Sequence, residues 1–306
     1  MAIKMIDFIK IKITDEALIN RVWSNEILEY DGKSEKRFND ELKELVKKKY
    51  KNLYFTKYQD RIEISGSLHY FFNNGNHNSN DFSVKDCINT IMQIRDLFTL
   101  DLEKCKLINL EYGVNIISSI DVEDLVHNIM YHEKRQFTRP TKHFYYKIAG
   151  NEAYKQIKAY NKSVQFPSLC NNTFRFEVKS KQSKYINSLD LFTLNDLAVT
   201  GTYNRLMKEL IKEWDNVLLF DLSKNIDEKY LNTYFWEDIL KNGYRNKFNN
   251  QKKRYYEKLG INNLHAQIRK ILIQKMQSLK TVHIPTNIYM ETAHLALITS
   301  QHYNVY

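Results

Sequence analysis

The chain contains little cysteine, proline or glycine, and it has no long apolar run. Of its 306 residues, three are Cys, three are Pro and eight are Gly. Cys87, Cys105 and Cys170 are odd in number and far apart, so they make neither a disulfide framework nor a zinc signature, and a reducing, intracellular location fits best. No apolar run approaches the roughly 18 residues of a membrane span. The first 13 residues alternate apolar with polar side chains and lack the apolar block of a signal peptide.

The chain is rich in positive charge and in aromatic rings. Its formal net charge is +10, its pI is about 9.2, and it contains 21 Tyr and 16 Phe. Such a charge balance favours an anionic partner, with nucleic acid first and a membrane surface second. Rings on a basic surface suit stacking on unpaired bases. The alternative is a mildly basic protein whose aromatic residues simply fill its core.

Hydrophobic periodicity predicts strands in series with a few helices between them. Period-2 alternation or apolar runs predict strands at 5–13, 53–58, 61–65, 107–117, 142–148, 155–161, 173–180 and 217–221. Helical spacing predicts helices at 83–97, 121–130 and 194–214, the last with a break near Gly201, and Ser83 with Asp86 forms a capping box. Strands without regular βα alternation indicate an α+β fold with a mainly antiparallel central sheet and flanking helices.

Two segments are harder to assign from the pattern. Residues 38–50 are charged and helix-prone, although they could equally form an exposed loop. A turn at Gly150-Asn151 is expected to join the strands at 142–148 and 155–161.

The composition changes near residue 223 and predicts two regions, 1–222 and 223–306. The second region holds 13 Lys and Arg residues but six Asp and Glu residues, so it carries +7 of the net charge. An apolar stripe at helical spacing predicts a helix; it consists of Leu264, Ile268, Ile271, Leu272, Met276 and Leu279. A basic, mostly helical C-terminal region is therefore expected to bind DNA through Lys247, Lys252, Lys253 and Arg254.

A polar loop follows the strand at 61–65. It contains Ser67, His77 and Asn78 within a stretch dense in Asn, Ser and His. Such a loop offers donors to a phosphate, or oxygen and imidazole ligands to a metal. An ordinary polar loop would have the same composition.

Tyr160 is the candidate nucleophile. On a strand it shares one face with Lys158 and Lys162. Nearby cations lower the pKa of a phenol and stabilise the charge that develops on an attacked phosphate. A solvated strand face with the same Lys-Tyr-Lys alternation is the alternative. Tyr145, Tyr146 and Tyr154 are rival nucleophiles.

Two strand carboxylates are candidate metal ligands. Glu111 interrupts an apolar strand, where a carboxylate is costly unless it is paired or binds a cation. The alternative is an outward-facing Glu111, because period 2 puts Leu110 and Glu111 on opposite faces of the strand. Glu177 shares a strand face with Arg175 and Lys179, so a cross-strand ion pair is the alternative. Together with His77 these carboxylates would make a hard site that prefers Mg²⁺ or Mn²⁺ to zinc.

The order of these motifs resembles the rolling-circle replication initiators of filamentous phages, the gene II type, and in part the trans-acting initiators of small plasmids. The resemblance rests on Met5 to Asp7 and on five ordered segments: Ile62 to Ser67, Gly75 to Asp81, Leu107 to Ile116, Ile157 to Lys162 and Phe174 to Val178. The chain departs from the family by an extra Asn76 before His77 and by Glu111 where the phage proteins have Asp. The histidine–hydrophobic–histidine triplet of the best-known nicking enzymes is absent from the sequence.

The resemblance implies an origin-specific, metal-dependent endonuclease with strand-rejoining activity. Tyr160 would keep the 5′ phosphate of the nicked strand, and the released 3′-OH would prime a host polymerase. Glu111, Glu177 and His77 would hold Mg²⁺ or Mn²⁺, and Ser67, Asn78 and Arg175 would contact DNA. The expected partners are origin DNA, a host helicase and a polymerase, with no membrane, in the cytoplasm of a bacterial host.

Two other functions fit the charge and the aromatic content. One is a single-stranded DNA-binding protein without catalysis, and the other is a metal nuclease that activates water and forms no covalent link. The ordered set of Tyr160, Lys162 and Glu177 favours the tyrosine-linked nickase.

Overall fold

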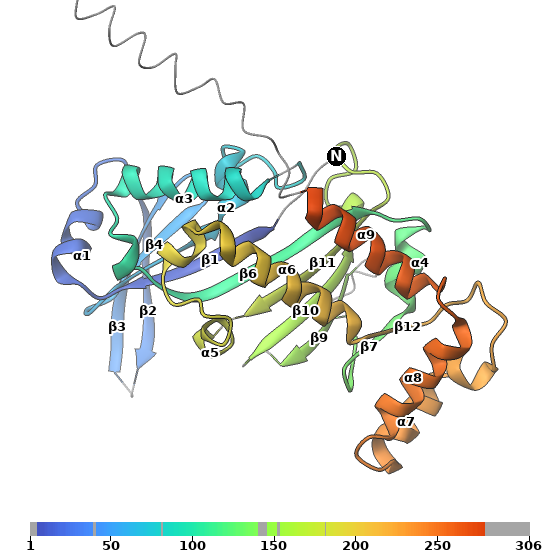
Figure 1. The fold of residues 1–306 in the computed structure, drawn as a ribbon. Coiled ribbons are helices and arrows are strands. Elements are labelled where there is room, and N and C mark those ends of the chain that lie inside the picture. Colours follow the sequence, from blue (N-terminus) through green and yellow to red (C-terminus); the bar gives the residue numbers. More distant parts are fainter. Residues whose placement is uncertain are drawn as a thin grey trace, which may run out of the picture.

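One large antiparallel sheet organises the molecule (Figure 1). The computed structural model describes residues 5–38, 41–80, 82–139, 146–151, 154–180 and 182–278. Within them, the strands of the large sheet lie side by side in the order β2 (Glu29–Phe38), β3 (Glu41–Tyr50), β4 (Leu53–Lys57), β5 (Ile62–Ser67), β1 (Ile6–Ile13), β6 (Lys106–Ile117), β11 (Thr173–Ser180), β10 (Lys155–Asn161) and β9 (Tyr146–Asn151). Each neighbouring pair is antiparallel, which confirms the expected α+β class.

Helices cover one face of this sheet. They are α2 (Leu68–Phe72), α3 (Val84–Phe98), α4 (Val122–Asn128), α5 (Ser183–Asn187), α6 (Thr200–Asp215) and α9 (Leu264–Ser278), and α1 (Glu16–Trp23) follows β1. Short 3₁₀ turns lie at η1 (Leu102–Lys104), η2 (Lys162–Val164) and η3 (Leu194–Ala198). Figure 1 shows α3, α6 and α9 running across the same side of the strands.

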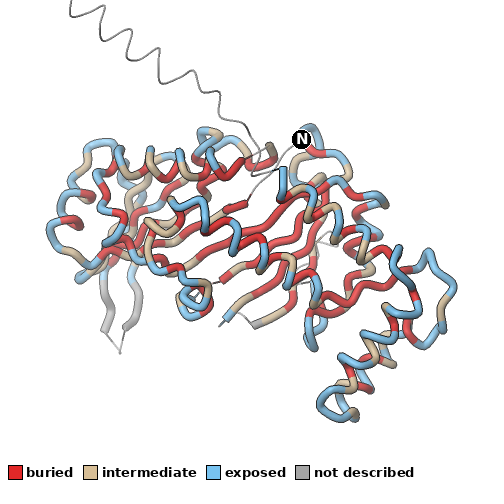
Figure 2. The backbone as a smooth tube through the Cα atoms, viewed as in Figure 1, coloured by how far each residue is buried: buried red, intermediate tan, exposed pale blue. Residues whose placement is uncertain are grey.

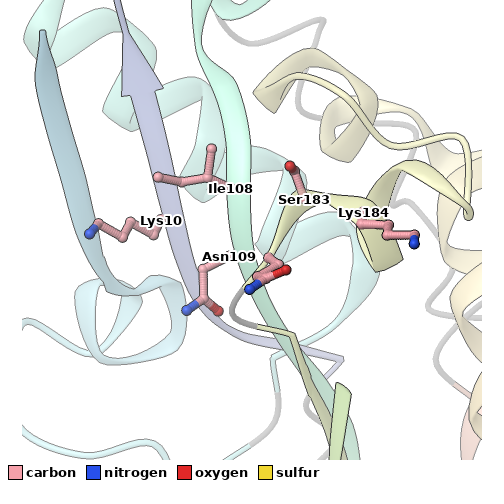
Figure 3. Close-up of a pocket in the computed structure, with 6 residues that line it drawn as sticks. Lys10, Ile108, Asn109, Ser183 and Lys184 are labelled. Atoms are coloured by element: carbon pink, nitrogen blue, oxygen red, sulfur yellow. The ribbon is translucent and has the colours of Figure 1, made fainter. Parts of the chain in front are cut away.

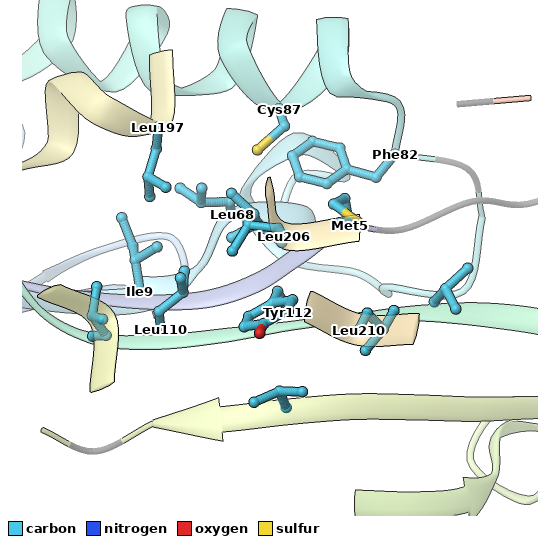
Figure 4. Packing of buried hydrophobic residues seen from close by; sticks show 14 of the residues in the cluster. Met5, Ile9, Leu68, Phe82, Cys87, Leu110, Tyr112, Leu197, Leu206 and Leu210 are labelled. Carbon is cyan, nitrogen blue, oxygen red and sulfur yellow. The ribbon is translucent and has the colours of Figure 1, made fainter. Parts of the chain in front are cut away.

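The main core lies between the sheet and these helices. Alternation along β1 buries Ile9 and Ile11, and the same face continues through Leu110 and Tyr112 of β6. Leu206 and Leu210 of α6 pack above them, as Figure 4 shows. Figure 2 shows the burial concentrated along the central strands. Apolar side chains on one face thus hold the helices, while the other face is left for polar and charged residues.

Most predicted elements are present. The structure confirms the strands at β1, β4, β5, β6, β10, β11 and β12, the helices α3 and α4, and the capping box of Ser83 with Asp86. The helical stripe near the C-terminus is α9, in which Leu264, Ile268, Leu272 and Met276 are buried, while Leu279 lies outside the described residues.

Three assignments are corrected. Within the segment at 38–50, the described residues Glu41–Tyr50 form β3 between β2 and β4 and are neither helix nor loop, because sheet pairing overrides helix propensity. Gly150 and Asn151 belong to β9 and not to a turn. The break in the segment 194–214 falls at Val199, where η3 ends, and Gly201 lies inside α6. Of the strand expected at 142–148, residues 142–145, which include Tyr145, lie outside the described range.

A second, smaller core lies beyond the large sheet. It is formed by a three-stranded sheet of β12 (Val217–Leu219), β7 (Ile129–His132) and β8 (Arg135–Gln136), by η4 (Glu228–Leu231), and by α7 (Thr233–Asn242) and α8 (Lys247–Leu259). Figure 1 shows α7 and α8 extending away from the main body. The α9 helix then returns to the main core. The predicted boundary between residues 222 and 223 stays a prediction.

Candidate active site on the polar face of the sheet

Three adjacent strands bring the predicted nucleophile and both predicted carboxylates onto one face of the sheet. Lys158 of β10 lies opposite Glu177 of β11, and Tyr160 lies opposite Arg175. On the other side of β11, Lys179 lies opposite Glu111 of β6. Residues directly opposite in an antiparallel pair share a face. This face is the one turned away from α3, α6 and α9, because the alternate residues of the same strands lie in the main core.

Lys158 joins the two carboxylates. Its Nζ lies 2.7 Å from Glu111 Oε2 and 2.8 Å from Glu177 Oε1. A second lysine, Lys179, places its Nζ 2.7 Å from Glu111 Oε1. Burial alone would raise the pKa of Glu177, but the charges of Lys158 and Arg175 overcome it and lower that pKa to about 2. Glu177 is therefore ionised, and both carboxylates converge on one cation position, which the Lys158 ammonium occupies.

Tyr160 lies beside this cluster and is almost fully buried, with 5% of its surface exposed. Its hydroxyl donates a hydrogen bond to Glu177 Oε2 at 3.3 Å. The Tyr146 ring packs against its ring, with the centroids 5.4 Å apart. Burial, followed by the charge of Glu177, raises the pKa of Tyr160 well above its ordinary value, and Arg175 opposes this only in part. The expectation that neighbouring cations lower this pKa is therefore wrong, because desolvation outweighs them.

Arg175 is the centre of a second group of contacts. Its Nε lies 2.5 Å from Glu177 Oε2, and its Nη1 donates to Asn115 Oδ1 at 3.0 Å. Its Nη2 lies 3.6 Å from Asp7 Oδ2, which is an ion pair too long for a hydrogen bond. The guanidinium is fully buried. It therefore holds Glu177, Asn115 and Asp7 around one charge.

Asp7 is a site residue to which the motif reading assigned no role. Ile6 pairs with Tyr112 and Phe8 pairs with Glu111, so Asp7 is the extra residue of a β-bulge in β1. Bulges re-aim side chains, and here the Asp7 carboxylate accepts from Ser67 Oγ at 2.8 Å and from Asn78 Nδ2 at 3.3 Å. The Met-Ile-Asp segment was part of the family resemblance. It was therefore the signal in the sequence that could have identified Asp7 as a site residue.

Lys162 links Tyr160 to the polar loop. Its Nζ donates to Asn78 Oδ1 at 2.8 Å and to Gln165 Oε1 at 2.7 Å, and it lies 5.8 Å from the centroid of the Tyr160 ring. Burial, with a smaller effect of Arg175, lowers the pKa of Lys162 to about 8. The structure thus joins Ser67, Asn78 and Lys162 to the site.

Gly113 leaves the space that this cluster needs. It lies directly opposite Glu177 across β6 and β11. A Cβ placed on it would come within 2.4 Å of both Glu177 Cβ and the Phe176 carbonyl oxygen. Only glycine therefore allows the two strands to approach this closely at the middle of the site.

The donor set fits a hard divalent cation in part. Glu111 and Glu177 are the oxygen donors that Mg²⁺ and Mn²⁺ prefer, and they already flank one cation position. His77 is not part of this arrangement; its Nδ1 lies 3.1 Å from Ser79 Oγ. Among the described residues, the group of three metal-ligating side chains within 4.8 Å of one another is instead His132, Glu133 and Glu213. In that group Glu213 is engaged by His132 and Lys155.

The predicted DNA-contacting residues of the C-terminal region lie on α8, away from Tyr160. Lys253 and Arg254 are exposed, whereas Lys247 and Lys252 are half-buried. Lys252 Nζ donates to the Asp215 carbonyl at the end of α6, at 2.9 Å. Lys252 therefore joins the two cores. Lys253 and Arg254 are exposed to solvent, and Lys253 forms an ion pair with Glu257 at 3.8 Å.

An open cavity of about 510 Å³ lies farther along the large sheet (Figure 3). Lys10 of β1 and Asn109 of β6 line it together with Ser183 and Lys184 at the start of α5. Lys10 is also paired with Glu63 at 2.5 Å. Lys10 and Lys184 thus place cationic side chains at the cavity, and positive charge of this kind attracts anions.

Comparisons with known proteins give one distant structural likeness. A rolling circle replication initiator protein from Geobacillus stearothermophilus is similar with a TM-score of 0.43 and 12% sequence identity, covering 79% of this chain and 97% of that chain. No protein-family model matches the sequence. No curated protein matches it either. A likeness of this degree leaves the function to be argued from the site itself.

None of the helices in the described residues is both long and apolar enough to cross a membrane.

Proposed function

We propose that this protein is a DNA-nicking and rejoining enzyme that initiates rolling-circle replication of a phage or plasmid, of the filamentous-phage gene II type. The observation that carries the proposal is the convergence of Tyr160, Glu177, Lys158 and Arg175 on one face of three adjacent strands. A phenol, an ionised carboxylate and fixed cations are the groups that attack on a phosphodiester requires. The family resemblance of the same segments supports it.

The reaction uses the Tyr160 oxygen as the nucleophile. This oxygen forms a bond to phosphorus, the bond from phosphorus to the 3′ oxygen breaks, and the 5′ phosphate stays on the protein as a phosphotyrosine ester. The phenolic proton moves toward Glu177 Oε2, which already accepts the hydrogen bond. The departing 3′ oxygen takes up a proton from water and becomes the primer end. Attack by a 3′-OH on the ester reverses these steps and rejoins the strand.

Fixed cations stabilise the charge that builds up on the attacked phosphate. Arg175 is held by Glu177, and Lys162 is held by Asn78 and Gln165, so neither of these two cations needs to reorganise during the reaction. The Tyr146 ring lies against Tyr160. Access of DNA therefore requires this ring to move.

We further propose that Glu111 and Glu177 would hold Mg²⁺ or Mn²⁺, and that His77 would become a third ligand once its loop moves. A bound divalent ion would act as a Lewis acid on a phosphate oxygen. Lys158 occupies the position between the two carboxylates. Metal binding at that position therefore requires the lysine to swing away, toward an incoming phosphate.

The nucleophile is tested with Tyr160→Phe. Purified protein is incubated with single-stranded origin oligonucleotides and Mn²⁺, and a denaturing gel reports a protein band shifted by covalently attached DNA. Tyr160→Phe should abolish this band, because it removes the attacking oxygen and keeps the ring. Tyr146→Phe is the matched control on the neighbouring strand and should still form the band.

The other outcomes of this experiment identify other functions. Cleavage that survives Tyr160→Phe would indicate a nuclease that activates water. Retarded DNA without cleavage under any metal would indicate a binding protein without catalysis.

The carboxylates are tested with Glu111→Gln and Glu177→Gln, which keep the shape of the side chain and remove its charge. Each should lower the nicking rate at least about 100-fold, the scale of losing one electrostatic group at a reacting centre. DNA binding should persist in a gel-shift assay. Glu63→Gln is the matched control, because Glu63 is a buried carboxylate on β5 with its own ion pairs to Lys10 and Arg61. Normal nicking by both variants would remove these residues from the site.

The proposal places the protein with DNA in the cytoplasm of a bacterial host. Lys253 and Arg254 of α8 are exposed and suit contact with origin DNA. A host helicase and a polymerase are the proposed partners of the opened strand.

A further inference from the structure

A small cavity lies at the end of the strands that carry the site. Its volume is about 200 Å³, and Ser79, Asn115, Ile117, Leu169, Cys170 and Thr173 are among the residues that line it. These residues come from the polar loop, from the end of β6, from the segment between η2 and β11, and from the first residue of β11. The cavity is smaller than the roughly 300–1,000 Å³ of pockets for drug-sized ligands. It therefore suits a single small group.

Asn115 connects the cavity with the proposed active site. Tyr160, Arg175 and Asn115 form one row across β10, β11 and β6. Neighbouring strands are about 4.8 Å apart, so this row spans about 10 Å from Tyr160 to Asn115. Asn115 takes part in both features, because its Oδ1 accepts from Arg175 Nη1 and its side chain borders the cavity.

The chain directly after Tyr160 forms one wall of the cavity. Phe166 N donates to the Lys162 carbonyl, and Cys170 N donates to the Phe166 carbonyl, so residues 162–170 form a compact turn. Asn172 then adopts a left-handed conformation with φ of 43°. Its side chain donates to the carbonyls of Ser118 and Ile120. This wall is therefore held in place before any ligand arrives, which lowers the entropic cost of binding.

The lining combines apolar walls with polar groups. Ile117 and Leu169 are large apolar side chains that remain 41% and 57% exposed. Ser79, Thr173 and Lys275 supply hydroxyl and ammonium groups. The Asn115 Nδ2 is buried without a hydrogen-bond partner among the described residues, which is a cost that a nearby acceptor would relieve. A nucleobase has two apolar faces and a polar edge, and so matches this lining.

We propose that this cavity binds one nucleobase of the DNA strand, next to the phosphate that Tyr160 attacks. The inference rests on the proposed function for the position of the strand. The base lies between Ile117 and Leu169 and fixes the register of the strand, so that one phosphodiester faces Tyr160. The cavity is thus a sequence-reading element of the nicking site.

Disulfide trapping tests the proposal without any chemistry at Tyr160. The full-length Tyr160→Phe chain is mixed with single-stranded origin oligonucleotides, each carrying one base with a short tether that ends in a mixed disulfide. Cys170 lines the cavity and keeps 9% of its surface exposed, whereas Cys87 and Cys105 are fully buried in the main core. The Cys170 thiolate attacks the disulfide of a tether that reaches it, forms a protein–DNA disulfide and releases the small thiol.

We expect trapping at one or two adjacent positions beside the nicking site, and none with Cys170→Ser. Equal trapping along the oligonucleotide, or trapping that persists with Cys170→Ser, would overturn the proposal.

Abasic oligonucleotides provide a second measurement. Removing the base at the trapped position should weaken binding to the Tyr160→Phe chain about 5- to 150-fold in a fluorescence anisotropy titration. Leu169→Ala should lose most of this sensitivity, while Val199→Ala, an exposed apolar residue before α6, should keep it. If the unmodified chain nicks DNA but no position-dependent trapping is seen, the base-binding role of the cavity is refuted and the proposed nicking activity is retained. If position-dependent trapping is seen without any nicking, the proposed nicking activity is refuted and the base-binding role of the cavity is retained.

Discussion

At the scale of single residues, the site is built from buried charges that compensate one another. Glu177 is shared by Lys158 and Arg175, and Glu111 is shared by Lys158 and Lys179. Desolvation makes buried ion pairs weak contributors to stability, and breaking one partner leaves an uncompensated charge. Such a network is therefore better explained by a role in binding or chemistry than by a gain in stability.

A buried lysine outside the site gives a prediction about pH and stability. Lys147 of β9 donates to the carbonyls of His127 and Ile129 at 2.6 and 2.8 Å. Burial, with a smaller effect of Arg139, lowers its pKa from 10.5 to about 8. Between these two values the unfolded chain binds a proton that the folded chain has lost. The free energy of unfolding therefore gains up to about 1.4 kcal/mol per pH unit from this group as the pH rises through that window.

Lys147→Met should remove this contribution. Urea unfolding at pH 8, 9 and 10 should show a smaller rise in the free energy of unfolding than the unsubstituted chain shows. Part of the rise will remain, because the pKa values of Lys162 and Lys252 are also lowered to about 8 by burial. Lys85→Met, an exposed position on α3, is the control and should leave the rise unchanged. Equal slopes for the two variants would contradict the assignment.

At the scale of elements, the close approach of β6 and β11 decides the geometry of the site. Glycine at position 113 lets Glu177 lie against the backbone of β6. The bulge in β1 brings Asp7 onto the same face from two strands away. Backbone irregularities, and not side-chain identity alone, therefore bring the carboxylates together.

Two Gly→Ala substitutions test whether β6 and β11 are closely packed, because both make the same chemical change at different places in the fold. Gly113→Ala should destabilise the fold by about 1–3 kcal/mol, the usual cost of overpacking, because the new Cβ meets backbone atoms of β11. Gly201→Ala lies near the start of α6 with nothing within 4 Å of its Cβ, and should stabilise by about 0.5–1 kcal/mol. Urea denaturation of both variants measures the difference. A stable Gly113→Ala chain would show that the two strands are not packed as closely as described.

At the scale of the whole molecule, two hydrophobic cores are joined by the last helices. The small core contains α7 and α8, and α9 returns to the main core. Trp214 of α6 donates through Nε1 to the His265 carbonyl, and Leu264 N donates to Asp221 Oδ2. A truncation after Asp221 would therefore remove part of the main core as well as the basic helix.

The role of α8 is better tested by charge than by truncation. The double substitution of Lys253→Gln and Arg254→Gln removes two exposed charges and leaves the core unchanged. The slope of log affinity against log salt should fall by about 0.7 for each lost phosphate contact on single-stranded DNA. Lys252→Gln is the contrasting variant and should lower stability, because Lys252 caps the Asp215 carbonyl. An unchanged slope for the double variant would exclude α8 from the DNA-binding surface.

The local pattern of the sequence was enough to predict much of the fold. Alternation along residues 5–13 and 173–180 and the capping box at Ser83 depend on neighbours in the chain, and the structure contains these elements. The pattern did not predict β3, because its charged, helix-prone residues become a strand only by pairing with β2 and β4. It also placed Lys158, Tyr160 and Glu177 on strand faces, since period 2 decides the face.

The sequence by itself thus determined the α+β class, the strand that carries Tyr160 and the charges around it. Only the tertiary structure decided which strands are neighbours, and therefore that Lys158 bridges Glu111 to Glu177 and that Asp7 joins Arg175. It also decided the pKa of Tyr160, because desolvation depends on every chain segment packed around the hydroxyl. Strand order and burial are properties of contacts distant in sequence, which no local pattern encodes.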